Sequence, residues 1–422
     1  MCINPCKLIN NTGMKKSKLL VTLITTAAVG VGGVVATAPW SVGHHGQPAV
    51  QSVNANADTA PANLPGAPQI TAKAAFLIEA NSGTVLYTKD ADARLPIASM
   101  TKVATLGVIY QALADGKITM DTPITVSDYA ASMGGSQAFL DAGSTYMVRD
   151  LVQSIVVASA NDSCVALAEH LAGGVPQFVT MMNQFARDAG ATNTNFVNCT
   201  GLPATGAYSC ARDMALMYQA IMRSPHYGDF NHVWLYDLTH PSGRVTGLTN
   251  TNKLIRTYPN CLGGKTGFTN EAGHCITVAA KAGDLQPIAV IIGASDSQTR
   301  FRESQALLDY AAANFTNQLL VDRTLPIKTV KAKNAVLDEV TLYPQQDYYC
   351  LTAKGTEPNL TIATEIPDVI TAPLNPDTDC GTVFVMQDGK VLAEIPVVPN
   401  LPVPAANYWQ TVQKIVSRSP LV

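Results

Sequence analysis

Apolar and polar positions follow two different periods along the chain, and the change between them divides the sequence. Near the start, the runs 72–80 and 84–89 are rich in apolar β-formers and flank an Asn-Ser-Gly turn, which predicts two strands. Apolar residues then recur at helical spacing from Val103 to Leu113, and Gly116 predicts the end of that helix.

Helical spacing continues through the middle of the chain. Amphipathic helices are predicted in four segments: 148–158, 162–173, 176–190 and 211–224. After them, the stretches 263–283 and 285–294 predict adjacent strands, and 300–315 predicts a closing helix. Strands at both ends with helices between them predict one mixed α/β domain, residues 67–317.

The pattern changes after Asn317, where short β-type runs are broken by Pro, Gly and Asp. Asp388-Gly389 between two such runs is a hairpin signal. We therefore predict a small all-β sandwich domain over residues 318–402. The last segment, 403–422, predicts an amphipathic helix with one apolar face, formed by Tyr408, Trp409, Val412, Ile415 and Val416.

The N-terminal segment predicts export. Basic residues follow Met14, and the uncharged apolar run Leu19–Ala38 comes directly after them. Residues 1–38 are therefore predicted to be a secretory signal peptide, with an uncleaved membrane anchor as the alternative. Residues 39–66, rich in Ala, Pro, Asn and Gly, predict a linker.

Charge and cysteine content narrow the function classes. A net charge of -3 offers no basic excess for nucleic acid. Seven cysteines follow the signal segment, and an odd number outside the cytoplasm implies a free thiol. Short spacings suggest the pairs Cys199–Cys210, Cys261–Cys275 and Cys350–Cys380, leaving Cys164; the alternative is that these are small buried residues. No CxxC motif is present, so we expect no metal and no other cofactor.

Ser99 and Lys102 stand three residues apart at the start of the first predicted helix. A serine hydroxyl needs a base to act as a nucleophile, and a lysine can be that base if its ammonium loses its proton. Burial and the positive end of a helix both lower a lysine pKa. Taken alone the pair is weak, since Ser99 could cap the helix and Lys102 could be exposed.

Two further motifs change that balance. Ser159-Ala160-Asn161 lies between two predicted helices, and Lys265-Thr266-Gly267 lies on a predicted strand. This ordered set is typical of penicillin-recognising serine enzymes. Around the motifs, "ASMTKVAT", "SANDSCVALAEHLAG", "TGLPATGAYSCARDMA" and "GGKTGFTNEAGHC" resemble segments of the D-alanyl-D-alanine carboxypeptidases, the low-molecular-mass penicillin-binding proteins of peptidase family S11.

The resemblance implies a mixed α/β serine β-lactamase/transpeptidase-like fold, with an antiparallel sheet and a helical cluster, before the all-β domain. It also implies catalytic roles. Ser99 would attack the peptide carbonyl and Lys102 would be the general base. Ser159 would relay a proton to the leaving amine, Asn161 would hold the substrate amide, and Lys265 would set the electrostatics of the site.

Substrate-binding residues are implied by the same resemblance. Thr266 and Arg302 would meet the terminal carboxylate of the substrate, and the N–H groups of Ser99 and Phe268 would form the oxyanion hole. Gly267 and Thr269 would line a strand on which the substrate backbone lies. Some relatives carry histidine in place of Phe268, and some carry arginine in place of Thr251, which leaves one charge fewer in this groove.

The expected substrate is a peptidoglycan stem pentapeptide, and β-lactams are expected to acylate Ser99. The expected location is the extracytoplasmic face of the bacterial cytoplasmic membrane, with the C-terminal helix on the membrane surface or, alternatively, packed on the β domain. Rival functions are a serine β-lactamase, a peptidoglycan endopeptidase and a non-catalytic cell-wall binding protein. The absence of any glutamate from Leu171 to Asn270 argues against a class A β-lactamase.

Overall fold

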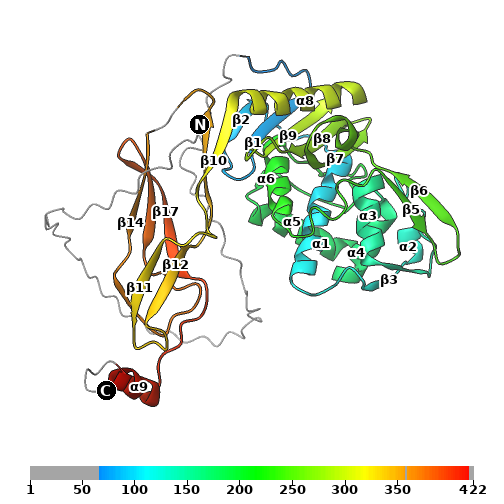
Figure 1. Ribbon diagram of the computed structural model, residues 1–422. Coiled ribbons are helices and arrows are strands. Elements are labelled where there is room, and N and C mark those ends of the chain that lie inside the picture. The colour runs from blue at the N-terminus through cyan, green and yellow to red at the C-terminus, as the bar shows by residue number, and fades with distance from the viewer. Residues whose placement is uncertain (1–65, 357–358, 418–422) are drawn as a thin grey trace, which may run out of the picture. The chain divides into compact units, whose positions relative to one another are not determined.

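The computed structural model describes residues 66–356 and 359–417 (Figure 1). The predicted signal peptide and nearly all of the predicted linker lie outside these residues. The described chain forms two compact units. The first ends at Asp322 and also takes in Gln346–Pro358, and the second holds Arg323–Gln345 and the chain from Asn359 onward.

A five-stranded antiparallel sheet is the centre of the first unit. Its strands lie in the order β2-β1-β9-β8-β7, with β7 at an edge. Their bounds are β1 Ala74–Glu79, β2 Val85–Lys89, β7 Cys261–Thr269, β8 Gly273–Ala280 and β9 Pro287–Ala294. Neighbouring residues of β1 face opposite sides, and every one of them is buried, so both faces of the sheet are covered.

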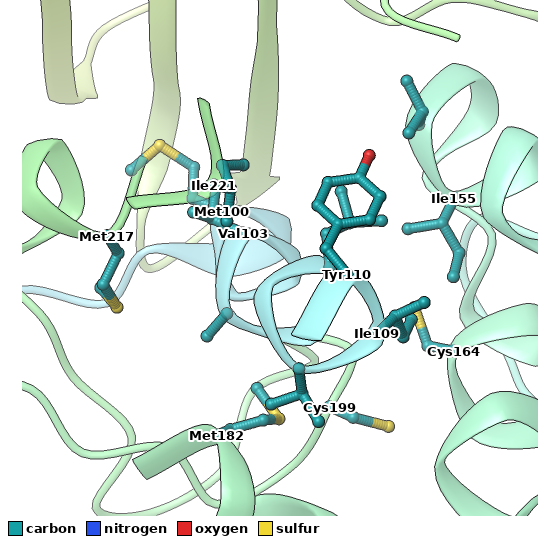
Figure 2. Close-up of a cluster of buried hydrophobic side chains, with 14 of the residues drawn as sticks. Met100, Val103, Ile109, Tyr110, Ile155, Cys164, Met182, Cys199, Met217 and Ile221 are labelled. Atoms are coloured by element: carbon teal, nitrogen blue, oxygen red, sulfur yellow. The ribbon is translucent and has the colours of Figure 1, made fainter. Parts of the chain in front are cut away.

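One face of the sheet packs on helix α8, Ser297–Asn314, and the other on a cluster of helices. The cluster contains α1 Lys102–Ala114, α3 Val148–Ala158, α4 Asn161–Ala172, α5 Val175–Asp188 and α6 Ala211–Met222. Almost all of α1 is buried, as expected for a helix that is apolar all round. Figure 2 shows α1 side chains such as Val103, Ile109 and Tyr110 among apolar residues of the surrounding elements.

Short elements complete the first unit. The 3-10 turn η1, Ala98–Thr101, precedes α1 directly. The others are β3 Pro123–Thr125, α2 Asp128–Ala131, β4 Thr145–Met147, β5 Leu235–Thr239, β6 Val245–Thr249, α7 Leu254–Thr257, β10 Phe315–Val321 and β13 Tyr348–Ala353. The strand and helix predictions for this region are confirmed, and the predicted segment 148–158 coincides with α3.

Apart from its C-terminal helix, the second unit is all-β, as predicted. Its strands are β11 Lys328–Lys333, β12 Glu339–Pro344, β14 Leu360–Glu365, β15 Val369–Thr371, β16 Thr382–Gln387 and β17 Lys390–Pro399. They form one six-stranded sheet in the order β14-β16-β17-β12-β11-β15. Its two halves are joined by β17, which pairs with β16 along most of its length and with β12 at its end. Asp388 and Gly389 both have positive φ, as the predicted hairpin turn requires.

One β-type segment belongs elsewhere than expected. The sequence pattern groups 348–353 with the all-β domain, whereas β13 pairs with β10 and lies in the first unit. The chain leaves that unit at Asp322, returns at Gln346 and leaves again. Alternation within a strand reports a strand but not its partner, so the sequence could not show this return.

The proposed disulfides are wrong, since all seven cysteines in the described residues are free and buried. Cys275 pairs with Gly267 across the ladder, so Cys261 lies six residues away along β7, roughly 20 Å at ~3.3 Å per residue. Cys350 and Cys380 belong to different units. Cys210 caps α6 through its sulfur instead of bonding to Cys199. The alternative of small buried residues is the one the structure supports.

Helix α9, Tyr408–Ser417, is the last described element of the second unit. Lys414 on its inner side donates to Ala335 O (3.0 Å) and pairs with Asp338. Tyr408, Trp409, Ile415 and Val416 are all exposed, so the apolar side of the helix does not pack on the β strands. Across residues 66–356 and 359–417, we find no helix with the length and apolarity needed to cross a bilayer.

Candidate active site

Ser99 lies in the η1 turn, immediately ahead of α1. The preceding residue, Ala98, has a positive φ of 48°, which is uncommon for a residue with a side chain and marks a constrained turn. Met100 N donates to Ile97 O and closes the turn. Ser99 remains partly exposed while its neighbours Ala98 and Met100 are buried, so the hydroxyl is accessible at the positive end of a buried helix.

Lys102 lies one turn further along and is completely buried. Its Nζ is 3.1 Å from Ser99 Oγ and donates to Thr200 O at 2.5 Å. Burial lowers the pKa of Lys102, against the opposing influence of Cys164, Cys199 and Asp162. A lysine with a lowered pKa can exist as a neutral amine, and its lone pair can then accept the proton of the adjacent hydroxyl.

Ser159 and Asn161 lie at the junction of α3 and α4. Ser159 caps α3 in the left-handed conformation (φ 63°), and this sharp turn allows α4 to begin two residues later. Asn161 Nδ2 donates to Gly134 O at 2.7 Å. Asn161 Oδ1 is buried without a hydrogen-bond partner in the described residues. An unpaired buried amide oxygen is available to accept a donor from a bound molecule.

Lys265 is on the edge strand β7 and is buried. Its Nζ donates to Ser159 Oγ at 2.8 Å and to Thr266 O at 3.0 Å. Burial, and then the positive charge of Lys102, hold the pKa of Lys265 well below its usual range. The structure thus brings the second and third motifs into direct contact, although 106 residues separate Ser159 from Lys265.

Gly267 shows how closely β7 approaches the turn that carries Ser99. A Cβ at this position would lie 2.6 Å from Ile97 O and 3.1 Å from Ser99 N. Gly201, with φ +80°, has the same relation to the other side of the turn, since its Cβ would lie 2.0 Å from Ala98 O. Glycine at both positions is what lets the three segments meet around Ser99.

The rest of β7 lies beside this centre. Thr266 Oγ1 donates to Thr251 Oγ1 at 2.8 Å, so the two hydroxyls form a pair next to Lys265. Phe268 is exposed and stacks on His274 with ring centroids 4.3 Å apart. Thr269 Oγ1 accepts Ala272 N and tightens the β7–β8 turn.

The family resemblance points to Arg302 as the arginine of the site, but in the structure a different arginine, Arg300, contacts β7. Arg302 NH2 donates to Thr299 Oγ1 within its own helix, at 3.3 Å. Arg300 is buried, and its NH1 donates to Gly267 O and Cys275 O at 3.3 Å each. The arginine that contacts β7 is therefore one the sequence interpretation missed. Helical spacing alone offered a signal, because Arg300 is on the same face as the buried Ser304 and Leu307.

Two other contributors were missed. Thr200 O and Gly134 O accept from Lys102 and Asn161, and both are backbone atoms, which carry no signature in a sequence.

Glu169, the only glutamate between the second and third motifs, accepts from Ser127 Oγ at 2.7 Å at the cap of α2. Its carboxylate is thus committed to a structural hydrogen bond.

Comparison with known proteins places this arrangement in a family. The profile described as D-alanyl-D-alanine carboxypeptidase matches residues 61–296, and one described as the C-terminal domain of penicillin-binding protein 5 matches 315–404. The chain is 39% identical over 327 residues to D-alanyl-D-alanine carboxypeptidase DacF of Bacillus subtilis, covering 77% of this chain and 84% of the relative. It is 32% identical over 358 residues to DacA of Escherichia coli K12, covering 82% and 87%.

Comparison with solved structures leads to the same family. Penicillin-binding protein 5 of Haemophilus influenzae superposes with a TM-score of 0.64 at 31% identity, over 80% of this chain and 98% of that one. The Streptomyces K15 DD-transpeptidase has a TM-score of 0.54 at 28% identity, over 58% of this chain and 97% of that one. The chain belongs to the peptidase S11 family of D-alanyl-D-alanine carboxypeptidases.

Proposed function

We propose that this protein is a serine-type D-alanyl-D-alanine carboxypeptidase that removes the terminal D-alanine from peptidoglycan stem pentapeptides. The observation that carries the proposal is the Ser99–Lys102 pair, with Nζ 3.1 Å from Oγ and the lysine fully buried. The names of the relatives indicate a substrate that ends in D-alanyl-D-alanine, and the Ser99–Lys102 geometry provides a nucleophile and a base to attack it.

In the proposed reaction, neutral Lys102 takes the proton of Ser99 as Oγ attacks the carbonyl carbon of the penultimate D-alanine. The N–H groups of Ser99 and Phe268 stabilise the oxyanion. Ser159, hydrogen-bonded to Lys265, relays the proton held by Lys102 to the leaving amine, so that Lys102 is neutral again as D-alanine departs. Water then attacks the acyl-serine ester and restores the free hydroxyl.

Groups around this centre would orient the peptide. The unpaired Asn161 Oδ1 would accept a substrate N–H, and the Thr266–Thr251 hydroxyls beside Lys265 would meet the terminal carboxylate. The peptide would lie as an added strand against the edge strand β7. Arg302 remains a proposed carboxylate ligand, although Arg300 is the arginine that bonds β7.

Release of D-alanine from diacetyl-L-lysyl-D-alanyl-D-alanine tests the proposal. The wild-type protein should release D-alanine, and Ser99→Ala should release none while keeping its fold by circular dichroism. A well-folded wild-type protein that releases no D-alanine from this substrate would contradict the proposal.

Two rival activities can be separated from it. Nitrocefin should give a single burst with slow release. Rapid hydrolysis of the acyl-enzyme in class A β-lactamases needs a glutamate, and the only glutamate between the second and third motifs is hydrogen-bonded to Ser127. Sustained turnover would favour a β-lactamase. An endopeptidase is favoured by one relative, the D-alanyl-D-alanine endopeptidase of Pseudomonas aeruginosa, 32% identical over 251 residues. Cleavage of cross-linked muropeptide dimers faster than pentapeptide monomers would identify that activity.

We also propose that the protein acts on the extracytoplasmic face of the bacterial membrane and that α9 lies on the membrane surface. The exposed Tyr408, Trp409 and Ile415 support this, because an apolar helix face with aromatic residues suits the bilayer interface. Removing residues 404–422 should release the mature, signal-cleaved protein from membranes. Unchanged membrane association would contradict the anchor.

A further inference from the structure

A pocket opens next to Ala98, the residue that precedes Ser99 in the chain. It contains about 480 Å³ of empty space, including the part open to solvent. Three segments line it: residues 96–101 at and before η1, the loop 195–208, and the end of β7 with the turn after it. Ala98, Leu202 and Thr269 represent these segments at its wall.

The pocket is uncharged except at one point. Of the described residues that line it, Glu271 alone is charged at neutral pH. Glu271 is exposed in the β7–β8 turn, and its carboxylate takes part in no hydrogen bond or ion pair that we find within 66–356 and 359–417. The Ala272 N to Thr269 Oγ1 bond fixes the backbone of this turn and so places Glu271 at the rim of the pocket.

Two asparagines of the pocket are already hydrogen-bonded within the loop. Asn198 Oδ1 accepts from Thr200 N and Gly201 N, and Asn195 Nδ2 donates to Gly206 O. Arg94, which stacks on Tyr208 and donates to Asn193 Oδ1, does not line the pocket. Because Glu271 is the one charged residue among the described lining residues, its carboxylate is the group expected to recognise a charged ligand.

Strand direction fixes which part of the substrate reaches this pocket, given the proposed function. A peptide added antiparallel to β7, with its terminal carboxylate at Thr266 and its scissile carbonyl at Phe268 N, runs with its preceding residues toward Thr269. At ~3.3 Å per residue, the residue before the two D-alanines comes level with the β7–β8 turn. Its side chain can then enter the pocket whose rim carries Glu271.

We propose that this pocket binds the side chain of the residue preceding D-alanyl-D-alanine, and that Glu271 selects an ammonium group at the end of that side chain. The substrate class is a stem peptide with a diamino acid at that position and its distal amine free. An uncharged wall of mixed polar and apolar groups can take the methylene stem, and the rim carboxylate suits the ammonium. A substrate whose distal amine is blocked or already cross-linked lacks this ion pair.

The test compares two peptides, Nα-acetyl-L-lysyl-D-alanyl-D-alanine with a free side-chain amine and its Nε-acetylated form. The ratio of their kcat/KM values for D-alanine release is measured in wild type, Glu271→Gln and Glu271→Lys. Wild type should prefer the free amine by about fivefold, the upper range for a partly exposed ion pair. Glu271→Gln should bring the ratio near one, and Glu271→Lys should reverse the preference.

Asp188→Asn is the matched control, because it removes one negative charge at the exposed end of α5, outside the pocket. It should keep the wild-type preference. An unchanged ratio in Glu271→Gln, or an equal loss in Asp188→Asn, would overturn the proposal.

Protection of Ser99 from a fluorescent penicillin by the same two peptides gives a readout that needs no turnover. Stronger protection by the free amine in wild type, lost in Glu271→Gln, supports the pocket even if no D-alanine is released, in which case only the proposed function fails. Release of D-alanine with equal protection by both peptides overturns the pocket and leaves the proposed function standing.

Discussion

Lys102 shows how a single residue is adapted to its proposed task. Its ammonium would be costly to bury, and no carboxylate in the described residues forms an ion pair with it. Burial instead lowers its pKa, and its hydrogen bonds to Ser99 and Thr200 keep the nitrogen beside the hydroxyl. The sequence predicted this pair from its spacing together with the two further motifs, whereas the acceptor Thr200 O could not be predicted because it belongs to a distant loop.

The lowered pKa predicts a pH dependence of acylation. Protonated Lys102 cannot accept the Ser99 proton, so the acylation rate should fall as the pH drops through the Lys102 pKa and rise above it. Lys102→Ala should lose about 10²–10⁴-fold in rate, the usual contribution of a general base. Stopped-flow acylation by nitrocefin from acid to alkaline pH measures both. A flat wild-type profile would contradict the role of Lys102.

The free cysteines make a second prediction at this scale. Burial raises the pKa of Cys164 and of Cys275 to about 11, so both should resist alkylation in the folded protein. Iodoacetamide in denaturant without reductant should modify all seven cysteines between Cys164 and Cys380. Recovery of an unreduced disulfide-linked peptide by mass spectrometry would show that the structure has the cysteine state wrong.

At the scale of elements, Gly201 lets its loop approach the nucleophile turn closely, and Gly206 in the same loop offers a comparison. Gly201 and Gly206 share a loop and nearly the same φ, +80° and +84°. A Cβ on Gly201 would lie 2.0 Å from Ala98 O, whereas a Cβ on Gly206 has nothing nearer than 4.0 Å. Comparing an alanine substitution at Gly201 with one at Gly206 therefore separates the cost of backbone strain from the cost of close packing.

Gly206→Ala should cost about 1–2 kcal/mol through its left-handed backbone and leave acylation of Ser99 unaffected. Gly201→Ala should cost more and should slow acylation, because Ala98 and Ser99 must shift. Urea unfolding and labelling by a fluorescent penicillin measure the two effects. Equal stability and equal labelling in the two variants would remove the packing argument.

How far the sequence predicts an element depends on the range of the interaction. The helix Val148–Ala158 and the strands around Lys265 follow from local period, and local period is visible in the chain. The pairing of β13 with β10 and the contact of Arg300 with Gly267 O depend on distant segments, which no local pattern encodes. The three motifs were predictable as a set because their order is characteristic, although roles such as that of Arg302 stay predictions.

At the scale of the whole molecule, the C-terminal helix is the proposed point of contact with a membrane surface. Its polar side is held by the Lys414–Asp338 pair, and Trp409 and Ile415 on the other side are 73% and 66% exposed. So much exposed apolar surface on one short helix is unusual unless something covers it. The proposed cover is the interface of the membrane.

The double variant Trp409→Ser/Ile415→Ser should therefore bind phospholipid vesicles much more weakly than wild type, while its release of D-alanine in solution stays the same. Gln413→Ser, on an exposed polar position of α9, is the control and should bind as wild type does. Co-sedimentation with vesicles measures the difference. Equal binding by all three proteins would leave the helix without a membrane role.

The central claim is that Ser99 is the nucleophile and that Lys102 activates it. The most direct test is mass spectrometry of the protein after penicillin G, with the adduct mapped to its peptide. We predict one added penicillin on the peptide that contains Ser99, none in Ser99→Ala, and greatly slowed formation in Lys102→Ala. An adduct on any other residue, or none in the folded wild-type protein, would contradict the account.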